Sequence, residues 1–138
     1  MFRSEGLYAI RTSIRAPRAN AHAERFVGTP YLWGGKSSFG IDCSGLVQVS
    51  LNAAGTGCPR DSDMQQDSLG RVLTTAESRK LQRGDLIFWQ GHVAIARDAD
   101  TIVHANAHHM ATVIEKTSEA IARIKAAGSE IAAIKRLT

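Results

Sequence analysis

The feature that most constrains the fold is an apolar pattern of helical spacing in the first half of the chain. One helix face collects residues at intervals of three, four, seven, eight and eleven: Cys43, Leu46, Val47, Ser50, Leu51 and Ala54. Asp42 stands at the N-cap position, and Gly55 stands where such a helix ends. The pattern predicts a buried amphipathic helix over residues 43–54.

The second half of the chain has the short apolar runs and turn residues of β-structure. These runs predict strands at residues 85–90, 92–97 and 101–105, and near 111–115 and 131–136. Further helices are expected over residues 20–28, with Asn20 as cap, and over 61–69 and 118–127. Helices first and strands second predict an α+β fold with an antiparallel sheet.

Composition narrows the class of protein. The 138 residues are 43% hydrophobic and 22% charged, which fits one globular domain and excludes a disordered tail or a coiled coil. The formal net charge of +4 is spread along the chain, so we expect no nucleic-acid partner. We find no apolar run of membrane-spanning length and no signal peptide, so we expect no membrane partner and a cytoplasmic location.

The chain divides into two unequal parts. Residues 1–18 are irregular and rich in arginine, and we interpret them as an arm or a remnant of an upstream region. Residues 19–138 form the predicted folded domain. Its two cysteines, Cys43 and Cys58, are too few for a disulfide scaffold, and a helix starting at Cys43 would carry the chain away from Cys58.

Cys43 is the first candidate for chemistry. A cysteine in the first turn of a helix meets the positive end of the helix dipole and unpaired backbone N–H groups, which lower the pKa of a thiol. The same N–H groups can receive the negative charge that develops on an attacked acyl group. The alternative is a small buried hydrophobic residue that happens to begin a helix.

Two histidines strengthen the first interpretation. If Arg97 pairs with Thr101 across a three-residue loop, His104 lies opposite Ala94 and diagonal to His92 on the same sheet face. A two-residue loop would place the two imidazoles on opposite faces. Two imidazoles beside a cysteine supply a nucleophile, a base and a group that orients the base.

Two further groups have competing explanations. His108 and His109 could join His104 in a zinc site, but their spacing matches no common zinc motif, so we expect no metal and no cofactor. Asp61 and Ser62 could cap a helix, or they could receive the ammonium group of a substrate.

Taken in order, these residues resemble the NlpC/p60 family of cell-wall peptidases. The resemblance rests on the runs YLWGG from Tyr31, DCSGLVQ from Asp42, GDLIF from Gly84, GHVAI from Gly91 and VHA from Val103. It implies a papain-like α+β fold in which the helix that bears the nucleophile packs on a central antiparallel sheet. It further implies that Cys43 is the nucleophile, His92 the base and His104 the orienting group.

The resemblance also assigns a substrate and its contacts. The implied reaction is hydrolysis of a murein stem peptide, most often between γ-D-glutamate and diaminopimelate. The substrate-binding residues would be Tyr31 near the oxyanion site, Trp33 as a cleft wall, Asp42 and Ser44 in the groove, and Asp61 and Ser62 at the amino terminus of the substrate.

Three other functions remain as alternatives. The first is a different thiol amidohydrolase or acyltransferase of the same fold. The second is a catalytically silent murein-binding module, although such a module would be expected to lose Cys43 or His92, and both are present. The third is a zinc protein.

Overall fold

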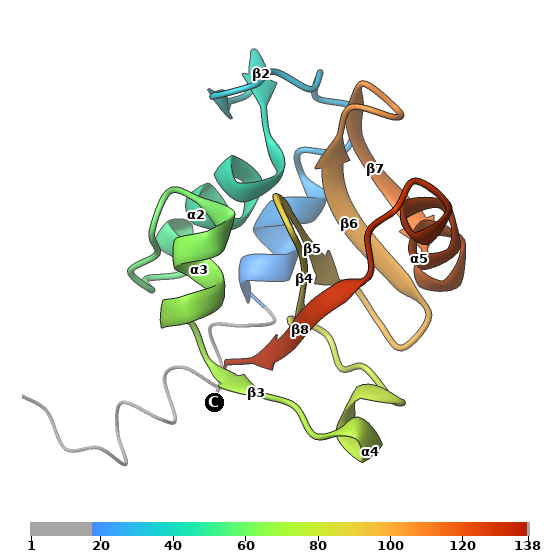
Figure 1. Cartoon of the computed structure of the whole chain (residues 1–138). Coiled ribbons are helices and arrows are strands. Elements are labelled where there is room, and N and C mark those ends of the chain that lie inside the picture. Colours follow the sequence, from blue (N-terminus) through green and yellow to red (C-terminus); the bar gives the residue numbers. More distant parts are fainter. Residues whose placement is uncertain (1–17, 138) are drawn as a thin grey trace, which may run out of the picture.

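The computed structural model describes residues 18–137 and confirms an α+β fold (Figure 1). Its centre is a six-stranded sheet with strand order β3-β8-β4-β5-β6-β7, in which each neighbouring pair is antiparallel. The strands are β3 (Arg71–Val72), β4 (Leu86–Trp89), β5 (His92–Ala96), β6 (Thr101–Asn106), β7 (Ala111–Lys116) and β8 (Ile131–Arg136). Each strand predicted in the second half is present within one or two residues of its expected ends.

Helices cover both faces of this sheet (Figure 1). They are α2 (Cys43–Ala53), α3 (Ser62–Ser68), the single-turn α4 (Thr75–Ser78) and α5 (Thr117–Ala126). The apolar side of α2 packs on one face, against Leu86, Phe88, Val93 and Ile95. The alternate strand residues Ile87, Trp89, Ala94 and Ile102 face the other way and pack with Ala120 of α5. Strand alternation therefore builds two cores from one sheet.

The N-terminal helix differs from its prediction. It occupies residues 18–24, and residues 25–28 form turns in which Phe26 N donates to Ala23 O and Val27 N to Glu24 O, while Gly28 N donates to Thr112 O at 2.9 Å. Asn20 is not its cap: it lies inside the helix, fully buried, and its side-chain amide donates to the carbonyl of Ala96. The predicted arm lies outside the described residues except for residue 18.

The strand β8 lies inside the sheet, between β3 and β4. Arg136 of β8 donates twice to the buried carboxylate of Asp85, at 2.9 Å from Nε and 2.9 Å from Nη2. This paired charge ties the end of the chain to the start of β4. A separate hairpin, β1 (Lys36–Ser37) with β2 (Gly40–Ile41), precedes α2.

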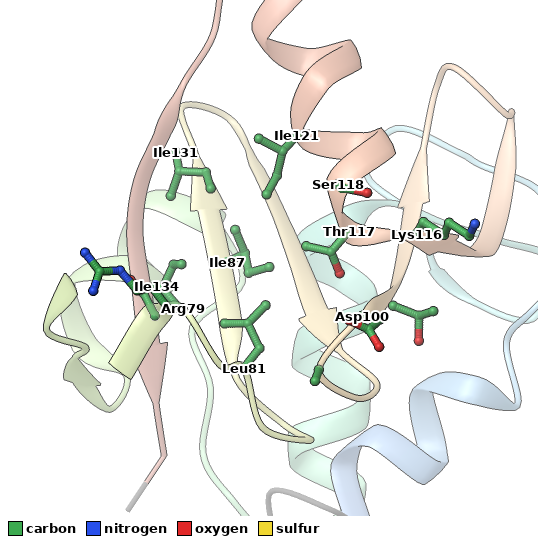
Figure 2. Close-up of a pocket in the computed structure, with 13 residues that line it drawn as sticks. Arg79, Leu81, Ile87, Asp100, Lys116, Thr117, Ser118, Ile121, Ile131 and Ile134 are labelled. Carbon is green, nitrogen blue, oxygen red and sulfur yellow. The ribbon is translucent and has the colours of Figure 1, made fainter. Parts of the chain in front are cut away.

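A cavity of about 700 Å³ lies on the α5 side of the sheet. Figure 2 shows that isoleucines from three elements face it: Ile87 of β4, Ile121 of α5, and Ile131 and Ile134 of β8. Neither Cys43 nor any histidine lines it. Within residues 18–137, no helix has both the length and the apolar character needed to cross a membrane.

Candidate active site

Asp42 shapes the start of α2. Its carboxylate accepts hydrogen bonds from the backbone N–H of Gly45 at 2.7 Å and of Gly34 at 2.9 Å, which confirms the predicted N-cap. Arg60 holds the same carboxylate through two nitrogens at 3.0 Å each and also lies 2.9 Å from Ser44 Oγ. Burial acts to raise the pKa of Asp42, but these hydrogen bonds lower it on balance. Asp42 is therefore held as a carboxylate.

The glycines around Cys43 let two backbone segments touch. A Cβ on Gly45 would lie 2.5 Å from the carbonyl oxygen of Gly35, and a Cβ on Gly35 would lie 2.4 Å from that of Gly40. Side chains at these positions would push the 29–42 loop away from the helix. The glycines of the motif are therefore needed for contact between loop and helix.

Cys43 is the first residue of α2 and is 8% exposed. Its Sγ lies 3.9 Å from the carbonyl oxygen of Gly91, the residue before His92. Burial raises the pKa of the Cys43 thiol, while the N–H groups of Val93 and Ser44 lower it, and the net direction is upward. The predicted lowering of this pKa is wrong for the unliganded protein, because desolvation outweighs the N–H groups at the start of the helix.

The two histidines lie as the three-residue loop predicts. Arg97 N donates to Thr101 O at 2.9 Å, and the ladder continues through Ala96 opposite Ile102. The same register places His104 and His92 on one face of the sheet. Their rings meet directly, with His92 Nε2 2.8 Å from His104 Nδ1. The assumed register is confirmed.

Two residues that the sequence did not point to, Glu115 and Arg123, extend the His92–His104 contact into a longer hydrogen-bonded chain. Glu115 Oε1 of β7 lies 2.8 Å from His104 Nε2, and Arg123 of α5 forms a two-point ion pair with the Glu115 carboxylate. A usable signal existed for Glu115: β6 pairs His104 with Val113, which puts Glu115 one diagonal step away on the same face. No local pattern singles out Arg123.

Burial sets the protonation of the two imidazoles. It lowers the pKa of His92 to about 3, helped by His104 and Arg123, while Glu115 acts in the opposite direction. Burial also lowers the pKa of the fully buried His104, against the contact with Glu115. Both rings are therefore neutral near neutral pH.

A cavity of about 330 Å³ opens beside Cys43. The substrate-binding residues expected from the sequence all line it with the thiol: Tyr31, Trp33, Asp42, Ser44, Asp61 and Ser62. Gly91 completes this wall, while the next residue, His92, lines an adjacent cavity of about 270 Å³. The Cys43 thiol therefore lines one cavity, and the His92 imidazole lines the other.

Tyr31 and Trp33 differ in how they meet the cavity. Burial raises the pKa of Tyr31, and the neighbouring Cys43 and Asp42 add to the effect, so its hydroxyl stays protonated and can donate a hydrogen bond. Trp33 is 86% exposed and presents most of its ring to solvent at the mouth. Tyr31 is suited to polar contact, and Trp33 to stacking against a bound chain.

Asp61 and Ser62 lie at the start of α3. Asp61 occupies the N-cap position, yet within residues 18–137 its exposed carboxylate makes no capping hydrogen bond. This geometry disfavours the interpretation of Asp61 as a helix cap. Gln65 of the same helix fixes the segment by donating to Ser44 O at 3.0 Å and to Pro59 O at 2.9 Å.

Two other candidates from the sequence remain, the second cysteine and a possible zinc site at the histidines. Cys43 and Cys58 are both free thiols, and burial raises the pKa of Cys58 to about 12. The ring nitrogens of His104 contact His92 and Glu115, not His108. Among the residues that the structure describes, no group of three or more His, Cys, Asp or Glu side chains is arranged to hold a metal ion.

Comparison with known proteins identifies the family. The NlpC/P60 family matches residues 28–127, which covers the loop, the cysteine helix, α5 and the strands of the sheet other than β8. The chain belongs to the NlpC/P60 family.

Curated relatives match part of the chain. Dipeptidyl-peptidase 6 of Lysinibacillus sphaericus is 38% identical over 81 residues, which cover 59% of this chain and 29% of the relative. A gamma-D-glutamyl-L-lysine dipeptidyl-peptidase of Bacillus cereus is 38% identical over 88 residues, covering 58% of this chain and 25% of the relative. The chain therefore spans less than a third of the length of these relatives.

Solved structures match most of the described fold. The peptidoglycan hydrolase RipB of Mycobacterium tuberculosis superposes with a TM-score of 0.75 at 25% identity, covering 93% of this chain and 67% of RipB. An NlpC/P60 family protein of Bacillus cereus gives a TM-score of 0.72 at 30% identity, covering 88% of this chain and 40% of that protein. The predicted NlpC/p60 fold is confirmed.

Proposed function

We propose that this protein is a cysteine peptidase that hydrolyses murein stem peptides at the amide between γ-D-glutamate and the diamino acid. The observation that carries the proposal is the placement of the Cys43 thiol against the backbone of Gly91, the residue before His92, in a cavity that Asp61 also lines, while His92 contacts His104. Relatives named as γ-D-glutamyl-L-lysine dipeptidyl-peptidases support this substrate class.

The first chemical step forms an acyl-enzyme. Burial raises the pKa of Cys43 and lowers that of His92, so the unliganded pair is a neutral thiol and a neutral imidazole. His92 accepts the thiol proton as the sulfur attacks the carbonyl carbon, and then gives that proton to the departing amine of the diamino acid. The backbone N–H of Cys43 and the hydroxyl of Tyr31 are the donors for the carbonyl oxygen.

The second step releases the acyl group. A water molecule gives one proton to His92, and its oxygen attacks the thioester carbon. The C–S bond breaks, the carboxyl product leaves, and the proton held by His92 returns to the sulfur of Cys43. His104 holds the His92 ring in place through both steps.

Asp61 is the group that we assign to binding a free amino terminus of the substrate. Its carboxylate is exposed at the cavity wall and makes no capping contact within the described residues, so it is available to a substrate ammonium, with Ser62 as a hydrogen-bond partner. A charge-assisted contact of this kind contributes about 1.5–3 kcal/mol.

Mass spectrometry of defined peptides tests the proposal. The protein is incubated with L-Ala-γ-D-Glu-diaminopimelate, its L-lysine counterpart and an N-acetylated version of each. Release of the diamino acid is expected, fastest from the free peptides. Turnover of none of the four by the wild-type protein rules the proposal out and leaves a different amide substrate or a silent binding module. A cytoplasmic location stays a prediction.

A further inference from the structure

The hydrogen-bond chain that starts at His92 continues beyond His104 to Glu115 and Arg123. His104 is fully buried and lies between two partners, His92 Nε2 at 2.8 Å from its Nδ1 and Glu115 Oε1 at 2.8 Å from its Nε2. The Glu115 side chain is only 9% exposed and is held by Arg123. Four side chains from β5, β6, β7 and α5 thus form one continuous chain.

A second group competes for the same nitrogen of His104. Asn106 Nδ2 lies 3.2 Å from His104 Nε2. The Asn106 amide cannot turn round freely, because its Oδ1 accepts from His109 N at 2.8 Å and lies 3.0 Å from His109 Nδ1. His104 Nε2 therefore faces an acceptor, Glu115, and a donor, Asn106, and only one of them can be satisfied.

The outcome of this competition decides where the lone pair of His92 lies. An ionised carboxylate only accepts, so contact with Glu115 requires the proton on His104 Nε2. A neutral imidazole has a single N–H, so His104 Nδ1 then accepts and His92 Nε2 must donate. The lone pair of His92 is left on Nδ1. If Asn106 donated instead, both rings would change tautomer and His92 Nδ1 would carry a proton.

We propose that Glu115 is a positioning residue for the reaction: paired with Arg123, its carboxylate outcompetes Asn106 for His104 Nε2 and so keeps the Nδ1 lone pair of His92 free to take the Cys43 proton. The inference rests on the proposed function for its chemistry, but the tautomers it specifies exist without substrate. Arg123 keeps Glu115 ionised: burial acts to raise the pKa of Glu115, and the contacts with Arg123 and His104 lower it on balance.

The charged and titratable groups around His104 come from every packed element. His92 faces it from β5, Glu115 from β7, Arg123 from α5 and His109 from the β6–β7 turn. Glu115 raises the pKa of both His92 and His104, whereas Arg123 lowers both. Removing Glu115 and removing Arg123 should therefore move the titration of the histidine pair in opposite directions.

The direct test is the tautomer, read from the ¹⁵N chemical shifts of the ring nitrogens in the full chain near neutral pH without substrate. Glu115→Gln replaces the carboxylate by an amide of nearly the same shape. The matched control is Glu77→Gln, which neutralises another carboxylate held at two points, by Arg71 at 2.9 and 2.8 Å, away from the cavity of Cys43.

We expect Nε2–H on both His92 and His104 in the wild type and in Glu77→Gln, and Nδ1–H on both in Glu115→Gln. Unchanged tautomers in a folded Glu115→Gln protein overturn the proposal. Asn106→Ala, which removes the competing donor, should retain the wild-type tautomers, and a changed tautomer in this variant also overturns it.

Kinetics supplies the second test. Glu115→Gln should lower kcat by about tenfold to a hundredfold with little change in KM, the loss typical of an outer partner that orients an imidazole. The acidic limb of the rate profile should move to lower pH in Glu115→Gln and to higher pH in Arg123→Gln. If the Glu115–Arg123 ion pair only supports the fold, both variants should have a lower melting temperature and an unchanged acidic limb of the rate profile. That result contradicts the proposal.

The two proposals can fail separately. If the wild type cleaves no stem peptide, the kinetic test is carried out instead by alkylating Cys43 with iodoacetamide near neutral pH in a Cys58→Ala background. Glu115→Gln should slow this alkylation as well, because it withdraws the base. Normal tautomers with no peptide cleavage reject the proposed function only, and an unaltered alkylation rate in Glu115→Gln rejects the role of Glu115.

Discussion

Cys43 and Cys58 are both free thiols, and burial raises the pKa of each, yet their neighbours differ. Cys43 begins an eleven-residue helix and lies against the backbone of Gly91, beside the histidine chain. Cys58 lies in the loop after that helix, with its sulfur 3.3 Å from Pro59 O. The residue that we propose as the nucleophile is the more buried of the two.

Neither exposure nor the resting pKa of the thiol distinguishes Cys43, the nucleophile that we propose, from Cys58. Cys43 differs in having backbone N–H groups that lower the pKa of its thiol against the effect of burial, and in lying against Gly91, next to the base that we propose, His92. In the proposed mechanism these N–H groups stabilise the negative charge that develops as the thiol gives its proton to the imidazole and the sulfur attacks. The side-chain hydrogen bond that lowers the pKa of Cys58 comes from Gln65, whose amide is not a base.

The largest expected effect separates the two thiols directly. Cys43→Ala should reduce kcat/KM for the free stem peptide by at least about a thousandfold, because no other group can form the thioester. Cys58→Ala should retain most of the activity. Circular dichroism checks that both variants are folded. An inactive Cys58→Ala together with an active Cys43→Ala would reverse the assignment.

Removing the base tests why Cys43 differs. His92→Ala should cost as much activity as Cys43→Ala, and the double variant no more than either, because groups that act as one unit are not additive. His104→Ala should cost less, since water can take part of its place. Initial rates across the four proteins measure this, and wild-type activity in His92→Ala would remove His92 from the mechanism.

A smaller effect concerns the far wall of the cavity. Asp61→Asn should lower kcat/KM by about tenfold to a hundredfold on a peptide with a free amino terminus, the value of one charge-assisted contact. The same variant should change little on the N-acetylated peptide, which has no ammonium group. Equal losses on both substrates would show that Asp61 supports the fold and does not bind the substrate.

The smallest effect is a pH dependence of labelling. Because burial raises the pKa of Cys43 above its ordinary value, the thiolate fraction at pH 6–8 is small and grows about tenfold for each pH unit. Alkylation of Cys43 in Cys58→Ala protein should therefore rise steadily over this range. A rate that is already constant at pH 6 would mean a lowered pKa and would contradict the structure.

The sequence by itself determined the elements and the local geometry of the site. The apolar period from Cys43 and the Asp42 cap predicted α2, and of the two loop lengths that the sequence left open, the three-residue loop between Arg97 and Thr101 gave the observed register of His92 and His104. These features depend on neighbours a few residues apart, where side-chain period and turn length follow from backbone geometry alone.

Tertiary structure alone decided the rest. Arg123 lies on α5, eight residues after Glu115, and it reaches the Glu115 carboxylate only because α5 folds back over the sheet. Arg60 meets Asp42 across eighteen residues, and the depth of Cys43 reversed its predicted pKa shift. Contacts between distant side chains and the loss of water around a charge depend on how elements pack, and no local pattern along the chain encodes them.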